Sequence, residues 1–250
     1  MCGRYASTRS AADLSALFDA VDETVELAPR YNLAPTDPAP VVWRPAPGPR
    51  RLAVARWGFL PHWAKHPREG ARMINARAET VATSPAFAPA FAARRDAGPR
   101  PLDRGLRSTP PGCGRALAPA DGWYEWRKLP AGRKQAYFLT PADGSVLALA
   151  ALWSRWSAQR LLTVAVVTTA AIGELARVHD RMPLLLPPER WAQWLSGHPA
   201  LDPPEPEFLA GLELRPVGPA VGNVRNDGPE LMAPIDIDRV ADEPPPTLFS

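Results

Sequence analysis

Cysteine is scarce in this chain of 250 residues, which contains only Cys2 and Cys113. With so few cysteines a disulfide framework is excluded, and we expect both thiols to be reduced. No apolar run approaches the ~18 residues of a membrane span. The first twenty residues mix charges and lack the apolar stretch of a signal peptide. These absences predict a cytoplasmic protein with no membrane partner.

Lysine is also scarce. Only 3 of the 29 basic residues are lysine and the other 26 are arginine, against 26 acidic residues, so the net charge is +3. Arginine suits phosphate recognition because its guanidinium can donate two parallel hydrogen bonds. An arginine-rich composition also follows from a GC-rich genome. The charge balance therefore permits nucleic acid as a partner without requiring it.

Regular alternation of strands and helices is missing, and short β-type runs dominate. Apolar residues at helical spacing predict a helix over 10–21, capped by Ser10 and reaching Val21. The pattern as a whole predicts an α+β domain around a curved, largely antiparallel sheet. Further helices are expected near 171–178, 188–196 and 206–212, and strands over 40–44, 51–59, 122–126, 136–140, 146–153 and 161–169.

The composition of two segments predicts little regular structure in them. Residues 96–114 are rich in Pro, Gly and Arg, and residues 237–250 form a Pro-rich tail. We therefore expect one domain over 1–236, with 96–114 as a disordered insertion, followed by a flexible tail. Cys113 falls in the insertion, which argues against a catalytic role because a flexible loop cannot hold a nucleophile in place.

The chain opens MCGRYAS, and removal of Met1 would leave Cys2 with a free α-amine beside its thiol. The ordinary pKa of an α-amine is ~7.7–8.0, against ~10.4 for lysine, so far more of it is neutral near pH 7.5. Such an amine attacks an aldehyde to give an imine, and the tethered thiol then closes a five-membered thiazolidine. A chance cysteine at an ordinary terminus is the alternative at this point.

The same terminus fits a second chemistry. Chains that begin Met-Cys-Gly include N-terminal-nucleophile glutamine amidotransferases, in which the thiol attacks an amide and the α-amine acts as base. Those enzymes usually carry an HRGP-like stretch and an Asn-Gly element downstream, and neither is present. An amidohydrolase of this kind stays a minor alternative.

The stretch ADGWYEW places Glu125 between aromatic residues on an expected strand. Strand alternation puts Glu125 on the face of Trp123, with Tyr124 and Trp126 on the opposite face. A carboxyl group against indole rings tends to have a raised pKa, which suits general acid–base catalysis. A glutamate on an edge strand facing water is the alternative.

The stretch ARVHDRMPLLLP places His179 directly after a short expected helix, beside Arg181. A histidine can shuttle protons near neutral pH and Arg181 could hold a phosphate, although a structural histidine at a helix end is the simpler interpretation. His62 and His66 have the spacing of a helical metal pair, but flanking prolines and the lack of a third ligand argue against zinc. We expect neither a metal nor a cofactor.

Together these motifs resemble the SOS-response-associated peptidase (SRAP) family, whose members sense abasic sites in DNA. The resemblance extends over almost the whole chain and rests on separate motifs in the same order. They are MCGRY at 1–5, RYNLAPT at 30–36, WGFLPHWAK at 57–65, MINARAET at 73–80, PADGWYEW at 119–126, VVTTAA at 166–171, HDRMPLLL at 179–186 and AVGNVRNDGPEL at 220–231.

The resemblance implies a barrel-like, largely antiparallel β core with flanking helices and a positively charged channel for single-stranded DNA. It implies that Cys2 forms a thiazolidine crosslink with the ring-opened aldehyde of an abasic deoxyribose. Met1 would first be lost, by the family's peptidase activity or by an aminopeptidase. Asn75 would position the amine and sugar, Glu125 would be the general acid/base, and His179 would assist ring opening and lyase-like crosslink reversal.

We expect a monomer that protects abasic sites in single-stranded DNA and is associated with the nucleoid when it is bound to DNA. The resemblance also implies a set of DNA contacts. The expected contacts are Arg4, Arg77 and Arg181 for phosphates, Thr168 for the backbone at the lesion, and Trp63 for stacking on bases.

Two departures from the family pattern precede PADGWYEW. An extra segment is inserted there, and Ala116 stands where a cysteine is usual. None of the expected site residues is lost. A non-covalent single-strand DNA-binding module with an inactive terminus also stays open as an alternative. The tail ends in Leu248 and Phe249, an adjacent apolar pair of the kind that docks in hydrophobic grooves, so a weak contact with a sliding clamp is a further expectation.

Overall fold

The computed structural model describes residues 2–45, 48–93, 112–156, 161–198 and 201–236. The tail with Leu248 and Phe249 and most of the expected insertion lie outside these ranges. Within them, no helix is both long enough and apolar enough to cross a bilayer.

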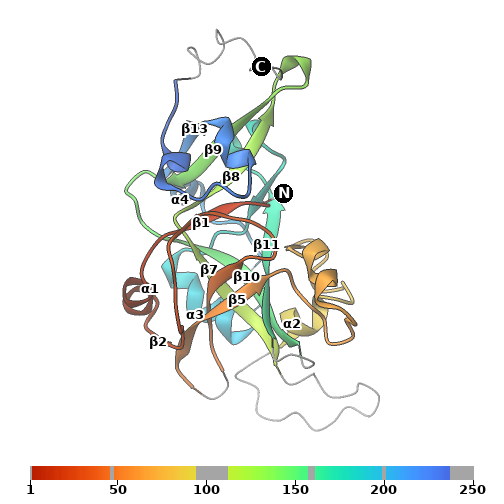
Figure 1. Ribbon diagram of the computed structural model, residues 1–250. Coiled ribbons are helices and arrows are strands. Elements are labelled where there is room, and N and C mark those ends of the chain that lie inside the picture. Colours follow the sequence, from red (N-terminus) through yellow and green to blue (C-terminus); the bar gives the residue numbers. More distant parts are fainter. Residues whose placement is uncertain (1, 46–47, 94–111, 157–160, 199–200, 237–250) are drawn as a thin grey trace.

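Five strands close into a barrel in the lower half of the molecule (Figure 1). Four antiparallel pairings run in the order β5, β4, β7, β10 and β11, and a parallel pairing of β11 with β5 joins the ends, with Thr163 opposite Arg56. The expected barrel-like α+β core is confirmed. The barrel strands are β4 (Pro38–Trp43), β5 (Arg50–Trp57), β7 (Cys113–Ala120), β10 (Leu147–Trp156) and β11 (Leu161–Ala170).

A second, antiparallel sheet lies above the barrel in Figure 1 and is continuous with it through the step from β7 to β8. Its strand order is β13-β9-β8-β1-β3. The strand β8 begins at Gly122. A side chain at this position would come within 2.4 Å of the carbonyl oxygen of Leu139, so the close pairing of the two strands requires glycine here. The strands are β1 (Tyr5–Ser7), β3 (Arg30–Leu33), β8 (Gly122–Lys128), β9 (Lys134–Pro141) and β13 (Leu212–Val217).

Three short strands extend the barrel sheet. The strands are β2 (Ala20–Asp22), which pairs with β5, and β6 (Asn75–Arg77) and β12 (Arg181–Pro183), which both pair with β11.

Alternation along β10 explains how the barrel is filled. Leu149, Ala151 and Trp153 belong to the cluster that contains Cys2 and Trp123, whereas Ala150 and Leu152 belong to a second cluster with residues of the helices. Both faces of the strand are therefore buried, which accounts for its nearly continuous apolar sequence. The second cluster includes residues of α1 (Ala11–Phe18), α2 (Ala88–Ala92) and α3 (Pro188–Ser196).

The helix expected over 10–21 is shorter than predicted. Ser10 caps it as expected, accepting from the amide of Asp13 at 3.1 Å. The helix ends at Phe18 because Asp19 adopts a left-handed conformation, with φ 47°. Val21 consequently lies on β2 and is half exposed instead of facing the core.

Two further expectations need correction, while the helix over 188–196 is confirmed as α3. The segment near 171–178 forms a 3-10 helix, and the helix near 206–212 is α4 (Pro206–Ala210), followed directly by β13. The 3-10 helices are η1 (Pro67–Arg72), η2 (Pro130–Gly132), η3 (Gly173–Arg177), η4 (Pro219–Gly222) and η5 (Pro229–Met232).

Cys113 was expected in the unstructured insertion, and this boundary is wrong. It is the first residue of β7 and pairs with Ser154 of β10. The described part of 96–114 therefore begins a barrel strand, whereas residues 96–111 lie outside the described ranges.

Candidate active site and nucleic-acid interface

Cys2 is held where the two sheets meet. It is fully buried and lies three residues before Tyr5, which begins β1 and pairs with Trp123 of β8. The side-chain amide of Asn75 donates a hydrogen bond to the carbonyl oxygen of Cys2 at 2.7 Å. Asn75 begins β6 and is opposite Val166 of β11, so it belongs to the barrel sheet. Residues from both sheets therefore fix the position of Cys2.

Asn75 also carries a second polar atom, the side-chain oxygen Oδ1. Its Oδ1 atom is buried and has no hydrogen-bond partner among the described residues. A buried polar atom without a partner costs free energy unless a ligand or water satisfies it. Asn75 can thus hold the Cys2 backbone with Nδ2 and accept from another group with Oδ1.

Glu125 belongs to β8, the strand of the second sheet that pairs with β1. It is only 3% exposed, and β8 is paired on both sides, so the alternative of a solvent-facing edge glutamate is wrong. Trp123 belongs to the cluster around Cys2, whereas Tyr124 and Trp126 belong to another, as alternation predicted. Burial raises the pKa of Glu125 to about 7, so the carboxyl group can give or take a proton near neutral pH.

The Cys2 thiol is kept in its protonated form. Burial raises its pKa far above the ordinary value, and the negative charge of Glu125 adds to this effect. A protonated thiol acts as a nucleophile only with the help of a base, and Glu125 is a titratable group whose charge acts on it.

His179 follows η3, as the sequence predicted, and its side chain is 30% exposed. Its Nδ1 accepts from the backbone amide of Arg181 at 3.0 Å and also lies 2.8 Å from a carboxylate oxygen of Asp180. Burial lowers the pKa of His179. Nδ1 cannot accept from Arg181 and donate to Asp180 in the same protonation state. Because burial lowers the pKa, we assign the neutral ring in which Nδ1 accepts from Arg181 and Nε2 carries the proton, so in this state the approach of Asp180 is not a hydrogen bond.

The predicted phosphate contact Arg181 is already engaged by the protein. Its guanidinium forms two hydrogen bonds with the carboxylate of Glu79, at 2.6 and 3.0 Å, and a third with the carbonyl oxygen of Thr168 at 2.7 Å. Thr168 is fully buried on β11, so its hydroxyl is not at the surface. The structure thus links Arg181 and Thr168 to each other.

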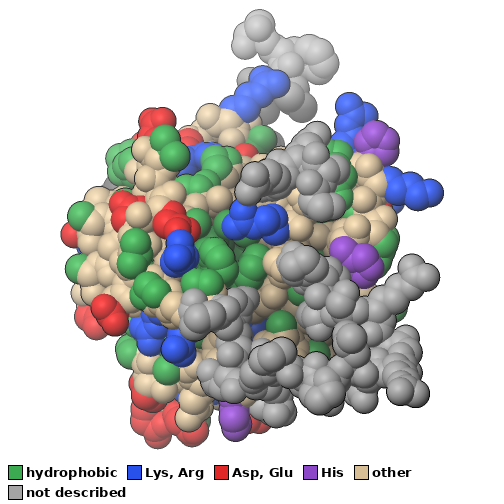
Figure 2. All heavy atoms as spheres, turned by 90° about the horizontal axis from the view of Figure 1, so that it is seen from below, with side chains coloured by type: hydrophobic (Ala, Val, Ile, Leu, Met, Phe, Trp, Pro, Cys, Tyr) green, Lys and Arg blue, Asp and Glu red, His purple; other side chains and the backbone are tan. Residues whose placement is uncertain are grey.

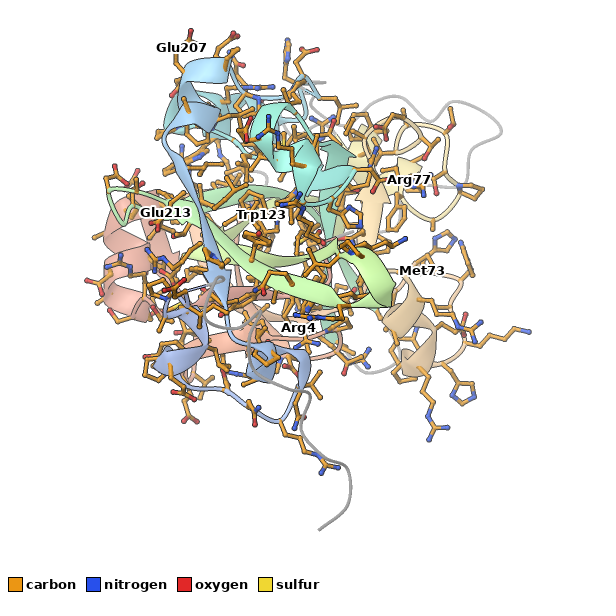
Figure 3. All side chains as sticks on the ribbon, turned by 90° about the horizontal axis from the view of Figure 1, so that it is seen from above. Arg4, Met73, Arg77, Trp123, Glu207 and Glu213 are labelled. Atoms are coloured by element: carbon orange, nitrogen blue, oxygen red, sulfur yellow. The ribbon has the colours of Figure 1, made fainter. Side chains whose placement is uncertain are left out.

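Arg4 is also engaged by the protein. It donates to the side-chain oxygen of Asn32 at 2.8 Å and to the carbonyl oxygen of Val221 at 2.9 Å, and it lies over the ring of Trp126. Figure 3 shows Arg4 and Trp123 on either side of the ribbon of β8 and β9. These contacts give Arg4 a structural role in tying the segment around Val221 to β1.

Arg77 and Trp63 are the predicted DNA contacts that are exposed. Arg77 is at the end of β6, towards the outer edge of the molecule in Figure 3, and Trp63 is 48% exposed. In the opposite view of Figure 2, the acidic side chains lie on the left and lower part of the face, whereas Lys and Arg side chains also extend to its upper right. Exposed arginine and tryptophan together suit a backbone contact and a base-stacking contact.

Sequence reasoning missed three residues that organise this region. Glu79 holds Arg181, and Asn32 and Asp227 join β3 to the segment after η4. Asp227 accepts from the backbone amides of both Tyr31 and Asn32, at 2.6 and 3.0 Å. All three residues lie inside motifs that carried the family resemblance. Their place in these motifs was the one feature of the sequence that could have marked them as important.

The described ranges contain no group of three or more His, Cys, Asp or Glu side chains placed to hold a metal ion. The histidines at 62 and 66 flank the exposed Trp63 in a turn before η1.

The chain was compared with known proteins. The family model "SOS response associated peptidase (SRAP)" matches residues 1–97 and 109–224. The protein named "Abasic site processing protein YedK" from Escherichia coli (strain K12) is 33% identical over 258 residues, covering 94% of this chain and 100% of the relative. "Abasic site processing protein YoaM" from Bacillus subtilis (strain 168) is 30% identical over 247 residues, covering 93% and 97%.

Solved structures agree on the fold. A crystal structure of a protein from Bacteroides thetaiotaomicron matches with a TM-score of 0.74 at 20% identity, covering 94% of this chain and 100% of that chain. Since the family model covers both sheets and every predicted site residue, this chain belongs to the SOS response associated peptidase (SRAP) family.

Proposed function

We propose that this protein recognises abasic sites in single-stranded DNA and forms a covalent thiazolidine crosslink with them through Cys2. The observation that carries the proposal is the hydrogen bond from Asn75 to Cys2, the residue that becomes an aminothiol when Met1 is removed, together with the buried Glu125 whose charge acts on the thiol. Family membership and the names of relatives, "abasic site processing protein", support the same substrate.

The reaction balances without a cofactor. The neutral α-amine of Cys2 adds to the aldehyde carbon of the opened deoxyribose, and loss of one water gives an imine. The thiol sulfur then adds to the imine carbon, and its proton moves to the nitrogen. The product is the thiazolidine, joined by one carbon–nitrogen and one carbon–sulfur bond.

Two residues would move the protons. With a pKa of about 7, Glu125 can take a proton from the thiol or amine and return it to the leaving hydroxyl. His179, with its proton on Nε2, would assist opening of the sugar ring and reversal of the crosslink. The buried Oδ1 of Asn75 would accept from the terminal amine or a sugar hydroxyl.

Peptidase activity would belong to the same site. Hydrolysis of the Met1–Cys2 bond needs an activated water and a proton for the new amine, and Glu125 beside Cys2 could serve both. Removal by an aminopeptidase is the alternative. In either case we propose a monomer in the cytoplasm that meets DNA through Arg77 and Trp63.

The test is a crosslinking assay with purified protein and a single-stranded oligonucleotide that contains one abasic site. The expected product survives heat and SDS. Its mass equals Met1-less protein plus DNA less one water, and the undamaged oligonucleotide gives none. Binding without any such product would favour the non-covalent module instead.

A further inference from the structure

The guanidinium of Arg181 already holds an anion in this structure. Both oxygens of Glu79 accept from it, at 2.6 and 3.0 Å, in the two-pronged arrangement that arginine also uses for phosphate. A DNA phosphate and the Glu79 carboxylate would therefore compete for the same donors. The two residues are 102 positions apart in the sequence, so it is the fold that brings them together.

The two partners differ in freedom to move. The side chain of Arg181 is 15% exposed and is also fixed to the backbone of Thr168, whereas the side chain of Glu79 is 50% exposed. When an anion arrives from solvent, Glu79 is the partner that can swing away. Hydrogen bonding to Arg181 lowers the pKa of Glu79, so this carboxylate is charged at neutral pH.

We propose that Glu79 is a built-in placeholder for phosphate, which keeps Arg181 oriented in the free protein and is displaced by the backbone of single-stranded DNA. This inference rests on the proposed function. Arg77 is exposed and acts electrostatically on Glu79, so it can make the first phosphate contact and receive the displaced carboxylate. The exchange makes binding weaker for an isolated phosphate than for a strand that engages both arginines.

The test measures the affinity of the full chain for an undamaged single-stranded oligonucleotide by fluorescence anisotropy. Glu79→Gln removes the competing charge and should tighten binding about two- to fivefold, the range of a partly exposed ion pair. It should also steepen the salt dependence by up to about 0.7 in the log–log slope, because Arg181 then gains a phosphate without losing a carboxylate.

Two further variants separate displacement from simple repulsion. In an Arg181→Ala background, Glu79→Gln should have no effect on affinity, since there is no guanidinium to release. The matched control is Glu213→Gln, which breaks the pair with Arg215 at 2.8 Å on the side of the molecule away from Arg77 in Figure 3. It removes the same charge and should leave the affinity unchanged. Thermal melting confirms that each variant is folded.

Several outcomes would overturn the placeholder. An equal gain with and without Arg181 would mean plain charge repulsion, and weaker binding by Glu79→Gln would mean that Glu79 only positions Arg181. Unchanged binding by Glu79→Gln, in a protein whose wild type still crosslinks abasic DNA, would defeat this inference alone. A wild type that neither binds nor crosslinks would defeat the proposed function as well.

Discussion

The side-chain amide of Asn75 donates a 2.7 Å hydrogen bond to the carbonyl oxygen of Cys2. Asn75 belongs to a strand on the barrel sheet, and Cys2 leads into β1 of the second sheet. This one bond therefore spans the junction of the two sheets and positions the residue on which the proposed chemistry depends.

Replacing Asn75 tests that positioning. Asn75→Ala should slow crosslinking about three- to tenfold, because one hydrogen bond that fixes Cys2 is lost. Asn75→Asp keeps the shape but cannot donate, so it should be as slow as the alanine variant. The crosslinking rate at saturating DNA measures this, and an aspartate variant as fast as wild type would exclude the donor role.

Glu125 should control the pH dependence of crosslinking. With a pKa of about 7, it becomes a base as pH rises through neutrality, and the wild-type rate should rise there. Glu125→Gln should lower the rate by about a hundredfold or more and leave only the rise near pH 8 from the α-amine. The measurement is the single-turnover rate from pH 5 to 9. A Glu125→Gln variant that keeps the inflection at neutral pH would contradict this role.

Glu125 should also link stability to pH. Burial raises its pKa from the ordinary 4.5 to about 7, so the folded state favours the protonated form. Its contribution to stability is fully present below pH 4.5 and is lost as pH rises through 7. Because one pKa unit is worth about 1.4 kcal/mol, the loss approaches about 3 kcal/mol. In urea unfolding, the free energy of unfolding of Glu125→Gln should rise relative to that of the wild type between pH 5 and 8. If the stability of both proteins depends on pH in the same way, the raised pKa of Glu125 is contradicted.

Replacing Arg77 and replacing Arg4 should have different effects, because Arg77 is exposed whereas Arg4 is hydrogen-bonded within the protein. Arg77→Ala should leave stability unchanged and flatten the salt dependence of binding to single-stranded DNA by about 0.7 in the log–log slope. Arg4→Ala should instead cost about 2 kcal/mol of unfolding free energy, because its contacts to Asn32 and Val221 are lost. Salt titrations and urea unfolding of both variants measure this. A large loss of stability in Arg77→Ala would contradict this difference.

The sequence pattern within a single strand or helix was enough to predict which side chains share a face. Alternation predicted that Glu125 shares the face of Trp123, and its predicted raised pKa is present because the side chain is buried. The helix over 188–196 was also predicted, and in the structure it ends at Ser196 because Gly197 adopts a left-handed conformation.

Long-range pairing accounts for what the sequence did not reveal. Cys113 stands among Pro and Gly residues that suggest a loop, yet pairing with Ser154 makes it part of a strand. The barrel is closed by Thr163 opposite Arg56, a parallel contact with no local signal. Likewise Arg181 looked available for phosphate because Glu79 is distant in sequence.

The central claim is that the terminal aminothiol of Cys2 makes the crosslink, and the second cysteine supplies the matched control. Cys2→Ala and Cys113→Ala should both bind abasic single-stranded DNA, but only Cys113→Ala should give the heat- and SDS-resistant adduct. The alanine at position 2 can form only an imine, which water reverses. A stable, wild-type-like adduct from Cys2→Ala would contradict the account.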